Sequence, residues 1–291
     1  MPLFPQGGGL YPDSIDNSIL ADMADGTLKG RALGAGVGNP QDLTVAQIWA
    51  LLGNPVFTNC RLDYVSTTVI RLNRCNGLLL TIDNLPRTIP AAGVDLAVTG
   101  LTVGTGYYIY AFMNAGVMTL EPSASGYLID ARNGLPVKSS DVTRTLVGWA
   151  RCGTSTQWYE SQFARWVASY WNRRPKWLNE NVNVVTASTS YVVVGNPLNV
   201  FVWADETLRM GMSGYVVSNT QSTANPTDFR VNGVSQNINA MGHAPIASGA
   251  VPIGCFGVIK PGENTYLLQA YGAASSGQGT WTGTCWAETN S

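Results

Sequence analysis

Charged residues are scarce in this sequence. Asp, Glu, Lys and Arg make up 12% of the 291 residues, about half of the usual ~25%. The net charge is −1, so the chain has no basic field that would gather nucleic acid. A surface this poor in charge is either simply neutral and polar or partly buried between subunits, where charge is costly to desolvate. The composition therefore favours association with other copies or other proteins.

Residues that carry catalytic or metal chemistry are also few. His243 is the only histidine, and no nucleophile motif lies near it, so neither a Ser-His-Asp nor a Cys-His system is predicted. We expect His243 in an exposed loop. A single histidine and five cysteines without a C-x-x-C pair predict no metal site, no disulfide framework and no cofactor.

Long apolar segments are absent as well. No run approaches the ~20 residues that a membrane span needs, and the first residues lack the basic start and apolar centre of a signal peptide. We therefore expect no membrane insertion, assembly in a cytoplasm, and cysteines that are mostly buried as small apolar residues.

The N-terminal part of the chain contains helix signals around a glycine-rich basic loop. Asp13 or Ser14 can cap a first helix, and Thr44 with Gln47 forms a capping box for a second one that Gly53 ends. Residues 1–56 bury too little apolar surface to be stable alone. They are predicted to form a docking or trimerisation module that packs against copies of itself, the β-rich body or a larger assembly. The side chains expected to make its contacts are Ile15, Ile19, Met23, Lys29, Arg31, Leu43, Ile48 and Leu51.

Short segments rich in Val, Ile, Thr and aromatic residues follow one another from residue 57 to the end. Turn signals such as Asn76-Gly77 and Asn232-Gly233 separate them. The pattern predicts a mainly β protein with two antiparallel β-sandwich or jelly-roll-like domains, at residues 57–177 and 178–291. Polar or glycine-rich segments at 218–228, 239–254 and 272–279 are predicted to be surface loops.

Aromatic and basic residues cluster between Trp158 and Trp177. Such a cluster can be a platform on which sugars or single-stranded nucleic acids stack. It can also be core together with a hinge between domains, and aromatic residues in strand-like segments favour this second interpretation.

Two motifs in the first fifth of the chain point to a family. The segments ADMADGTLKGR (residues 21–31) and GVGNPQDLTVAQIWALL (residues 36–52) resemble the N-terminal part of tail-fibre and receptor-binding proteins of tailed phages. A weaker resemblance continues through residues 107–174. The resemblance implies a homotrimeric virion protein whose N-terminus docks on other virion proteins and whose C-terminus is free.

Two functions remain open under this resemblance. The protein is either an adhesin whose C-terminal loops bind a host-surface glycan or protein, or a purely structural head fibre, tail collar or connector component. A polysaccharide-degrading tailspike is a distant third, because no pair of carboxylates stands out for the acid and base roles that it needs. For an adhesin, the loop composition favours a neutral sugar, and the predicted contact residues are Tyr215, His243, Tyr271 and Trp281.

Overall fold

The computed structural model describes residues 28–38, 40–53, 55–153, 156–218, 224–243, 250–274 and 277–290. The protein is mainly β, with several antiparallel sheets and, among these residues, one helix. The chain divides into two compact units, residues 1–55 and residues 56–291. The predicted first helix, with Ile15, Ile19 and Met23, lies outside the described residues.

The described part of the first unit is a short hairpin followed by a helix. Strand β1 (Leu28–Gly30) pairs with β2 (Gln41–Leu43), and α1 (Val45–Leu51) follows. The predicted capping box is confirmed: the Gln47 backbone N–H donates to the Thr44 hydroxyl, and the Thr44 N–H donates to the Gln47 side chain. Gly53 has a φ of 77°, so the left-handed residue that commonly ends a helix lies where the sequence predicted it.

The second unit begins with a β-rich region formed by residues 57–175, which we call region 1. It contains a six-stranded sheet (β10–β11–β12–β8–β9, with β14 beside β12), a three-stranded sheet (β3–β4–β7) and the β5–β6 hairpin. The strands are β3 (Cys60–Ser66), β4 (Val69–Arg74), β5 (Leu79–Ile82), β6 (Leu85–Thr88), β7 (Val94–Ala97), β8 (Gly106–Asn114), β9 (Val117–Ser123), β10 (Tyr127–Ile129), β11 (Pro136–Lys138), β12 (Asp141–Arg151), β13 (Ala164–Arg165) and β14 (Val167–Ser169).

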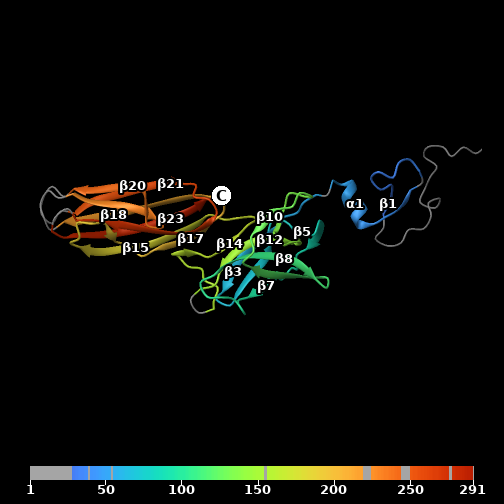
Figure 1. Cartoon of the computed structure of the whole chain (residues 1–291), viewed down its shortest axis with the longest axis horizontal. Helices are drawn as coiled ribbons and strands as arrows, with labels where there is room; N and C mark the ends of the chain where they lie inside the picture. Colours follow the sequence, from blue (N-terminus) through green and yellow to red (C-terminus); the bar gives the residue numbers. More distant parts are fainter. Residues whose placement is uncertain are drawn as a thin grey trace, which may run out of the picture. The chain divides into compact units, whose positions relative to one another are not determined.

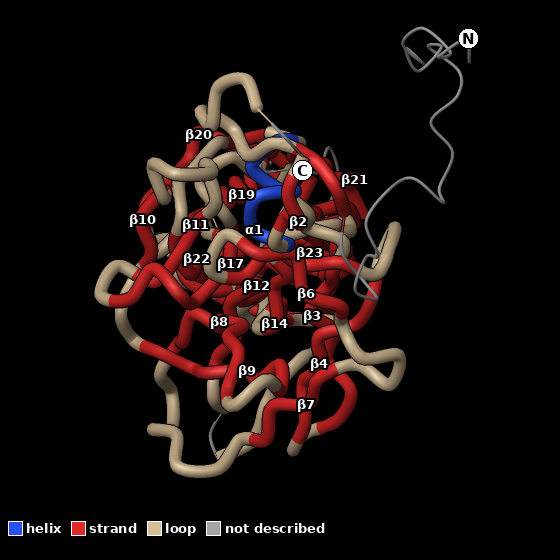
Figure 2. The backbone as a smooth tube through the Cα atoms, turned by 90° about the vertical axis from the view of Figure 1, so that its right-hand side faces the viewer, coloured by secondary structure: helices blue, strands red, loops and turns tan. Residues whose placement is uncertain are grey.

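One hydrophobic core holds the sheets of region 1 together. Ile70, Leu72, Leu80, Ile109 and Val147 belong to it and come from different sheets. Figure 2 shows β8 and β9 beside β4 and β7, in agreement with the contact between β7 and β9. Strand β12 is buried from residue 145 to residue 150, because alternate residues face this core and a second apolar cluster on the other side of the sheet.

Residues 176–290 form a second β-rich region, region 2, which is drawn from yellow to red in Figure 1. One sheet has the order β15–β23–β18–β21, and the other has the order β17–β22–β19–β20 with β16 beside β22. Strand β13 of region 1 extends this second sheet next to β17. Apolar side chains from both sheets form a single core. The strands are β15 (Lys176–Thr186), β16 (Val192–Val193), β17 (Leu198–Val202), β18 (Thr207–Ser218), β19 (Ala224–Val231), β20 (Val234–His243), β21 (Ala250–Ile259), β22 (Asn264–Gly272) and β23 (Gly279–Asn290).

Region 2 confirms one predicted turn and corrects the predicted loops. Asn232 and Gly233, with φ values of 50° and 79°, join β19 to β20, as a two-residue hairpin requires. Residues 224–228 and 250–254 were wrongly predicted to be loop, because they belong to β19 and β21. The same is true of residues 239–243, which belong to β20. The polar residues of β20, such as Gln236 and Asn239, hide the strand pattern in the sequence.

Buried contacts join the two regions into one unit. The rings of Trp149 and Phe201 stack with centroids 4.1 Å apart. The Arg165 guanidinium donates to both carboxylate oxygens of Glu206, at 2.8 and 3.0 Å, and both side chains are almost fully buried. The hydroxyls of Tyr108 and Tyr127 donate to Glu263 at 2.7 Å. Burial first, and this carboxylate second, raise the pKa of both tyrosines above the ordinary value.

Candidate functional site

The predicted docking residues of the first unit have different surroundings. Lys29 forms an ion pair with Asp42 at 2.8 Å across the β1–β2 hairpin. The Arg31 guanidinium donates to the carbonyls of Ala35 and Gly36, so the glycine-rich loop folds around it. Leu43 is buried, with Gly30 leaving room for its side chain. These contacts stabilise the hairpin itself.

The described apolar residues of α1 leave this unit with an uncovered surface. No helix residue is buried, Ile48 is half-buried, and Leu51 is exposed. Leu33 and Val37 in the loop are exposed as well. Leu33, Val37 and Leu51 therefore expose apolar side chains in this unit, and its docking role stays a prediction.

The four predicted receptor-binding residues do not form one site. Tyr215 is exposed on β18, whereas Trp281 is fully buried in the core of region 2 and donates its indole N–H to Thr227 at 3.0 Å. Trp281 therefore cannot make the predicted receptor contact, because its ring is not accessible to a ligand. Gly279, where a Cβ would lie 2.6 Å from the Trp281 ring, leaves the space that this ring fills.

The other two residues belong to the sheet that contains β22, β19 and β20. His243 is the last residue of β20, and its backbone pairs with Ala224; it lies in a strand and not in the predicted loop. Tyr271, on β22, has the Arg230 guanidinium 4.3 Å from its ring centroid. Arg230 in turn donates to Asp228 at 2.8 Å, so one face of the Tyr271 ring is already covered.

An aromatic surface lies on the outward side of the β15–β23–β18–β21 sheet; we call it the outer sheet face. Trp286 stacks on Trp177 with centroids 5.0 Å apart and on Phe256 with centroids 5.8 Å apart. Gly211 lies between Trp286 and Phe256 in the register, and a Cβ there would come within 3.1 Å of the indole. The exposed apolar residues on this face are Trp177, Val185, Tyr215, Phe256 and Val258.

The outer sheet face is almost free of charge. Among its described strand residues, Arg209 and Glu288 are the charged ones, and they pair across neighbouring strands at 3.5 Å. Asn, Thr and Ser occupy most of the remaining outward positions. An exposed surface that is both apolar and neutral is typical of a protein–protein contact.

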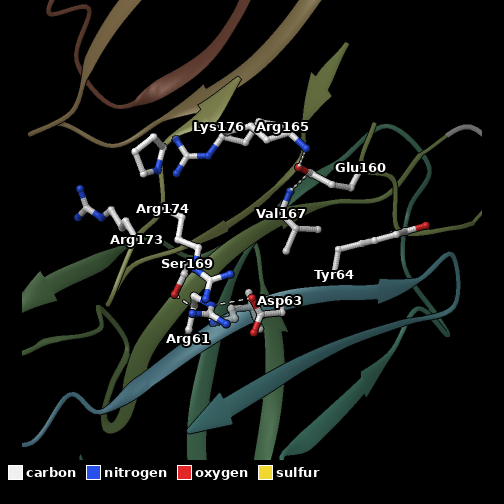
Figure 3. A pocket seen from close by; sticks show the side chains of 12 residues that line it. Arg61, Asp63, Tyr64, Glu160, Arg165, Val167, Ser169, Arg173, Arg174 and Lys176 are labelled. Atoms are coloured by element: carbon white, nitrogen blue, oxygen red, sulfur yellow. Dashed lines mark hydrogen bonds and ion pairs between the residues drawn. The ribbon is translucent and has the colours of Figure 1, made fainter. Parts of the chain in front are cut away.

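A cavity of about 340 Å³ lies at the junction of regions 1 and 2, and we call it the arginine pocket. Figure 3 shows the side chains that line it. Most of its basic side chains already have acidic partners. Lys176 pairs with Glu160 at 2.8 Å, and Arg61 pairs with Asp63 at 2.7 Å. Arg165 pairs with Glu206, as described above, and the remaining ion pair joins Arg173 to Asp205 at 2.6 Å. These pairs make the pocket primarily a polar joint between the regions.

A second cavity, the Tyr159 pocket, has a volume of about 460 Å³. The chain brings two distant segments together there, because β13 pairs in parallel with β17 and aligns Ala164 with Asn199. The cavity is lined by Tyr159, Phe163, Ala164, Trp166, Glu180, Asn196, Pro197 and Asn199. Part of the aromatic cluster noted in the sequence therefore lines an open cavity, whereas Trp158 is fully buried in the core of region 1.

The described residues offer little for catalysis or metal binding. They contain no group of three or more His, Cys, Asp or Glu residues able to hold a metal ion. The five cysteines are free, and burial raises the pKa of the Cys285 thiol to about 12. The described part of the chain also has no helix with the length and apolarity of a membrane span.

The carboxylates of region 2 have partners that define their roles. Glu206 and Asp228 pair with arginines, Glu263 accepts from two tyrosines, and Glu180 accepts from Asn196 at 2.7 Å. This arrangement does not present two free carboxylates across a cavity.

Comparison of the chain with protein-family models and with curated protein sequences gives no match.

Proposed function

We propose that this chain is a structural protein of a tailed-phage virion, a trimeric fibre or receptor-binding protein. Its N-terminal unit docks on the particle, and region 2 faces the host surface. The resemblance of residues 21–31 and 36–52 to such proteins supports this proposal. The low content of charged residues and the exposed apolar residues of the first unit agree with it.

The strand orders of region 2 support a jelly roll. Successive strands from β15 to β23 divide between the β15–β23–β18–β21 sheet and the β17–β22–β19–β20 sheet, around one core. Double-sheet jelly rolls are common in viral capsid and lectin domains. In this proposal, region 2 is the domain that associates with its copies and presents binding surfaces.

The outer sheet face is the single observation that carries the proposal furthest. Four strands about 4.8 Å apart, with about eleven residues each, span on the order of 700 Å², close to the ~800 Å² per partner of a standard stable interface. The face has one ion pair and exposes Trp177, Phe256 and Val258. A neutral, apolar surface of another copy fits it better than water or a charged partner does. In a trimer that surface is a different face of the neighbouring copy, because a face that pairs with itself closes a dimer.

Removal of residues 1–55 tests the docking part of the proposal. We expect the remaining unit, residues 56–291, to stay soluble, because its cores lie entirely within it. Particles assembled with the truncated chain should lack it in mass spectrometry of the purified virion, whereas the full chain should be present. Equal incorporation of the two forms would contradict N-terminal docking.

A further inference from the structure

The Tyr159 pocket has the composition of a small-molecule site. The rings of Tyr159 and Trp166 are tilted by 58° with centroids 5.0 Å apart, so they form an angled apolar wall. Phe163 adds a further ring to the lining. Ligand sites typically combine such apolar walls with a few polar groups that fix the orientation of the ligand.

Unused hydrogen-bonding groups lie beside these rings. Asn196 donates to one carboxylate oxygen of Glu180 and leaves Oε2 available. The side-chain amide of Asn199 forms no hydrogen bond within the described part of the chain. The indole N–H of Trp166 lacks a partner among the same residues, but it is fully buried, so the Asn199 amide is the donor that a ligand in the pocket can reach. Together these groups offer acceptors for hydroxyl groups and at least one donor.

The charge of the lining selects the class of ligand. Glu180 is the one charged residue among the described lining residues, and a carboxylate repels phosphates, uronic acids and sialic acids. A basic group close to this lining, the Arg151 guanidinium, lies over the Trp166 ring at 4.5 Å and donates to the Gly104 carbonyl at 3.0 Å. Because of these two contacts, the Arg151 guanidinium is not available to pair with an anionic ligand.

We propose that the Tyr159 pocket binds one residue of a neutral sugar, with the sugar's apolar face on Tyr159 and Trp166 and its hydroxyls on Glu180 and Asn199. The host-surface origin of this sugar rests on the proposed function, whereas the chemistry of the pocket does not. A single such contact is weak, with a dissociation constant in the millimolar range. Three copies on each of several fibres would supply avidity.

The test uses the purified full-length chain and saturation-transfer NMR with the methyl glycosides of glucose, galactose, rhamnose and N-acetylglucosamine. We expect millimolar binding of at least one of them and no binding of glucuronate or glycerol phosphate. Tyr159→Ala and Asn199→Ala should weaken the binding roughly tenfold, a loss of about 1.4 kcal/mol. Tyr191→Ala is the matched control, because Tyr191 and Tyr159 are each 39% exposed and Tyr191 lies outside the pocket lining.

Three outcomes would overturn the assignment: no binding of any neutral probe at tens of millimolar, equal binding of the anionic probes, or equal losses in the Tyr159 and Tyr191 variants. Glu180→Gln keeps the shape of the pocket and removes its negative charge, so this variant should bind glucuronate where the wild type does not. Failure of sugar binding by a chain that still forms trimers and enters particles would remove this inference alone. Sugar binding by a chain that is absent from particles would support the pocket and contradict the virion function.

Discussion

Regions 1 and 2 are both β-rich, but they differ in the number of ion pairs that they contain. Region 1 has ion pairs such as Arg71–Asp95 and Arg132–Asp130, and Glu121 pairs with both Lys138 and Arg144. In region 2, the ion pairs between described residues are Arg209–Glu288 and Arg230–Asp228. Charged residues are therefore scarcer in region 2 than in region 1. In the proposed function, region 2 is accordingly the region that contacts other copies, and region 1 is the one whose outer surfaces contact water.

The largest expected effect comes from placing charge on the outer sheet face. Phe256 is 55% exposed in the single chain, so Phe256→Lys should cost the isolated subunit little. In an assembly, the same lysine would be buried at each interface without a partner, which is strongly unfavourable. We expect the variant to elute as a monomer in size-exclusion chromatography with light scattering.

The matched control places the same charge on region 1. Val117, at the start of β9, is 65% exposed, and Val117→Lys should leave the assembly unchanged. If both variants were monomers, or if neither was, the claim that region 2 and not region 1 makes the contact between copies would be wrong.

The second effect concerns the junction between the regions. Glu206→Gln would leave the buried Arg165 guanidinium without its counter-ion, and removal of one partner from a buried pair costs about 3–5 kcal/mol. The free energy of unfolding, measured with urea, should fall by that amount. Asp95→Asn, in the exposed pair with Arg71, should change it little; similar losses in the two variants would mean that burial of the junction pair does not matter.

The smallest effect is a pH dependence that belongs to region 1. Burial alone would raise the pKa of Glu121, but hydrogen bonds from Lys138 and Arg144 outweigh it, and the pKa lies below the ordinary value. The stabilisation is therefore present above the unfolded-state pKa of about 4.3 and is lost as the pH falls through the folded-state value. The melting temperature of the wild type should decrease on acidification, and Glu121→Gln should reduce that slope. An unchanged slope would show that the ion pairs of Glu121 contribute nothing.

Local chemistry made parts of the fold predictable from the sequence. The Thr44–Gln47 capping box and the Asn232-Gly233 hairpin depend on residues next to each other in the chain. Strand β20 was missed because its outward residues are polar. The role of Trp281 was misjudged because its burial depends on the sheet packed across the core, which its own segment does not reveal.

The candidate sites were predictable only in part. An aromatic cluster near Trp166 is visible in the sequence, but its division into buried rings and a pocket depends on the pairing of β13 with β17. The outer sheet face combines every second residue of four strands that are far apart in the chain, and Trp177 meets Trp286 only through their register. Long-range pairing of this kind leaves no local signal.

The mass of the purified full-length protein in solution tests the central claim most directly. Light scattering at micromolar concentration should give three times the chain mass of 31.1 kDa, and the value should stay constant on dilution through that range. A single species with the mass of one chain would contradict the account, because the outer sheet face would then be exposed to water without a partner.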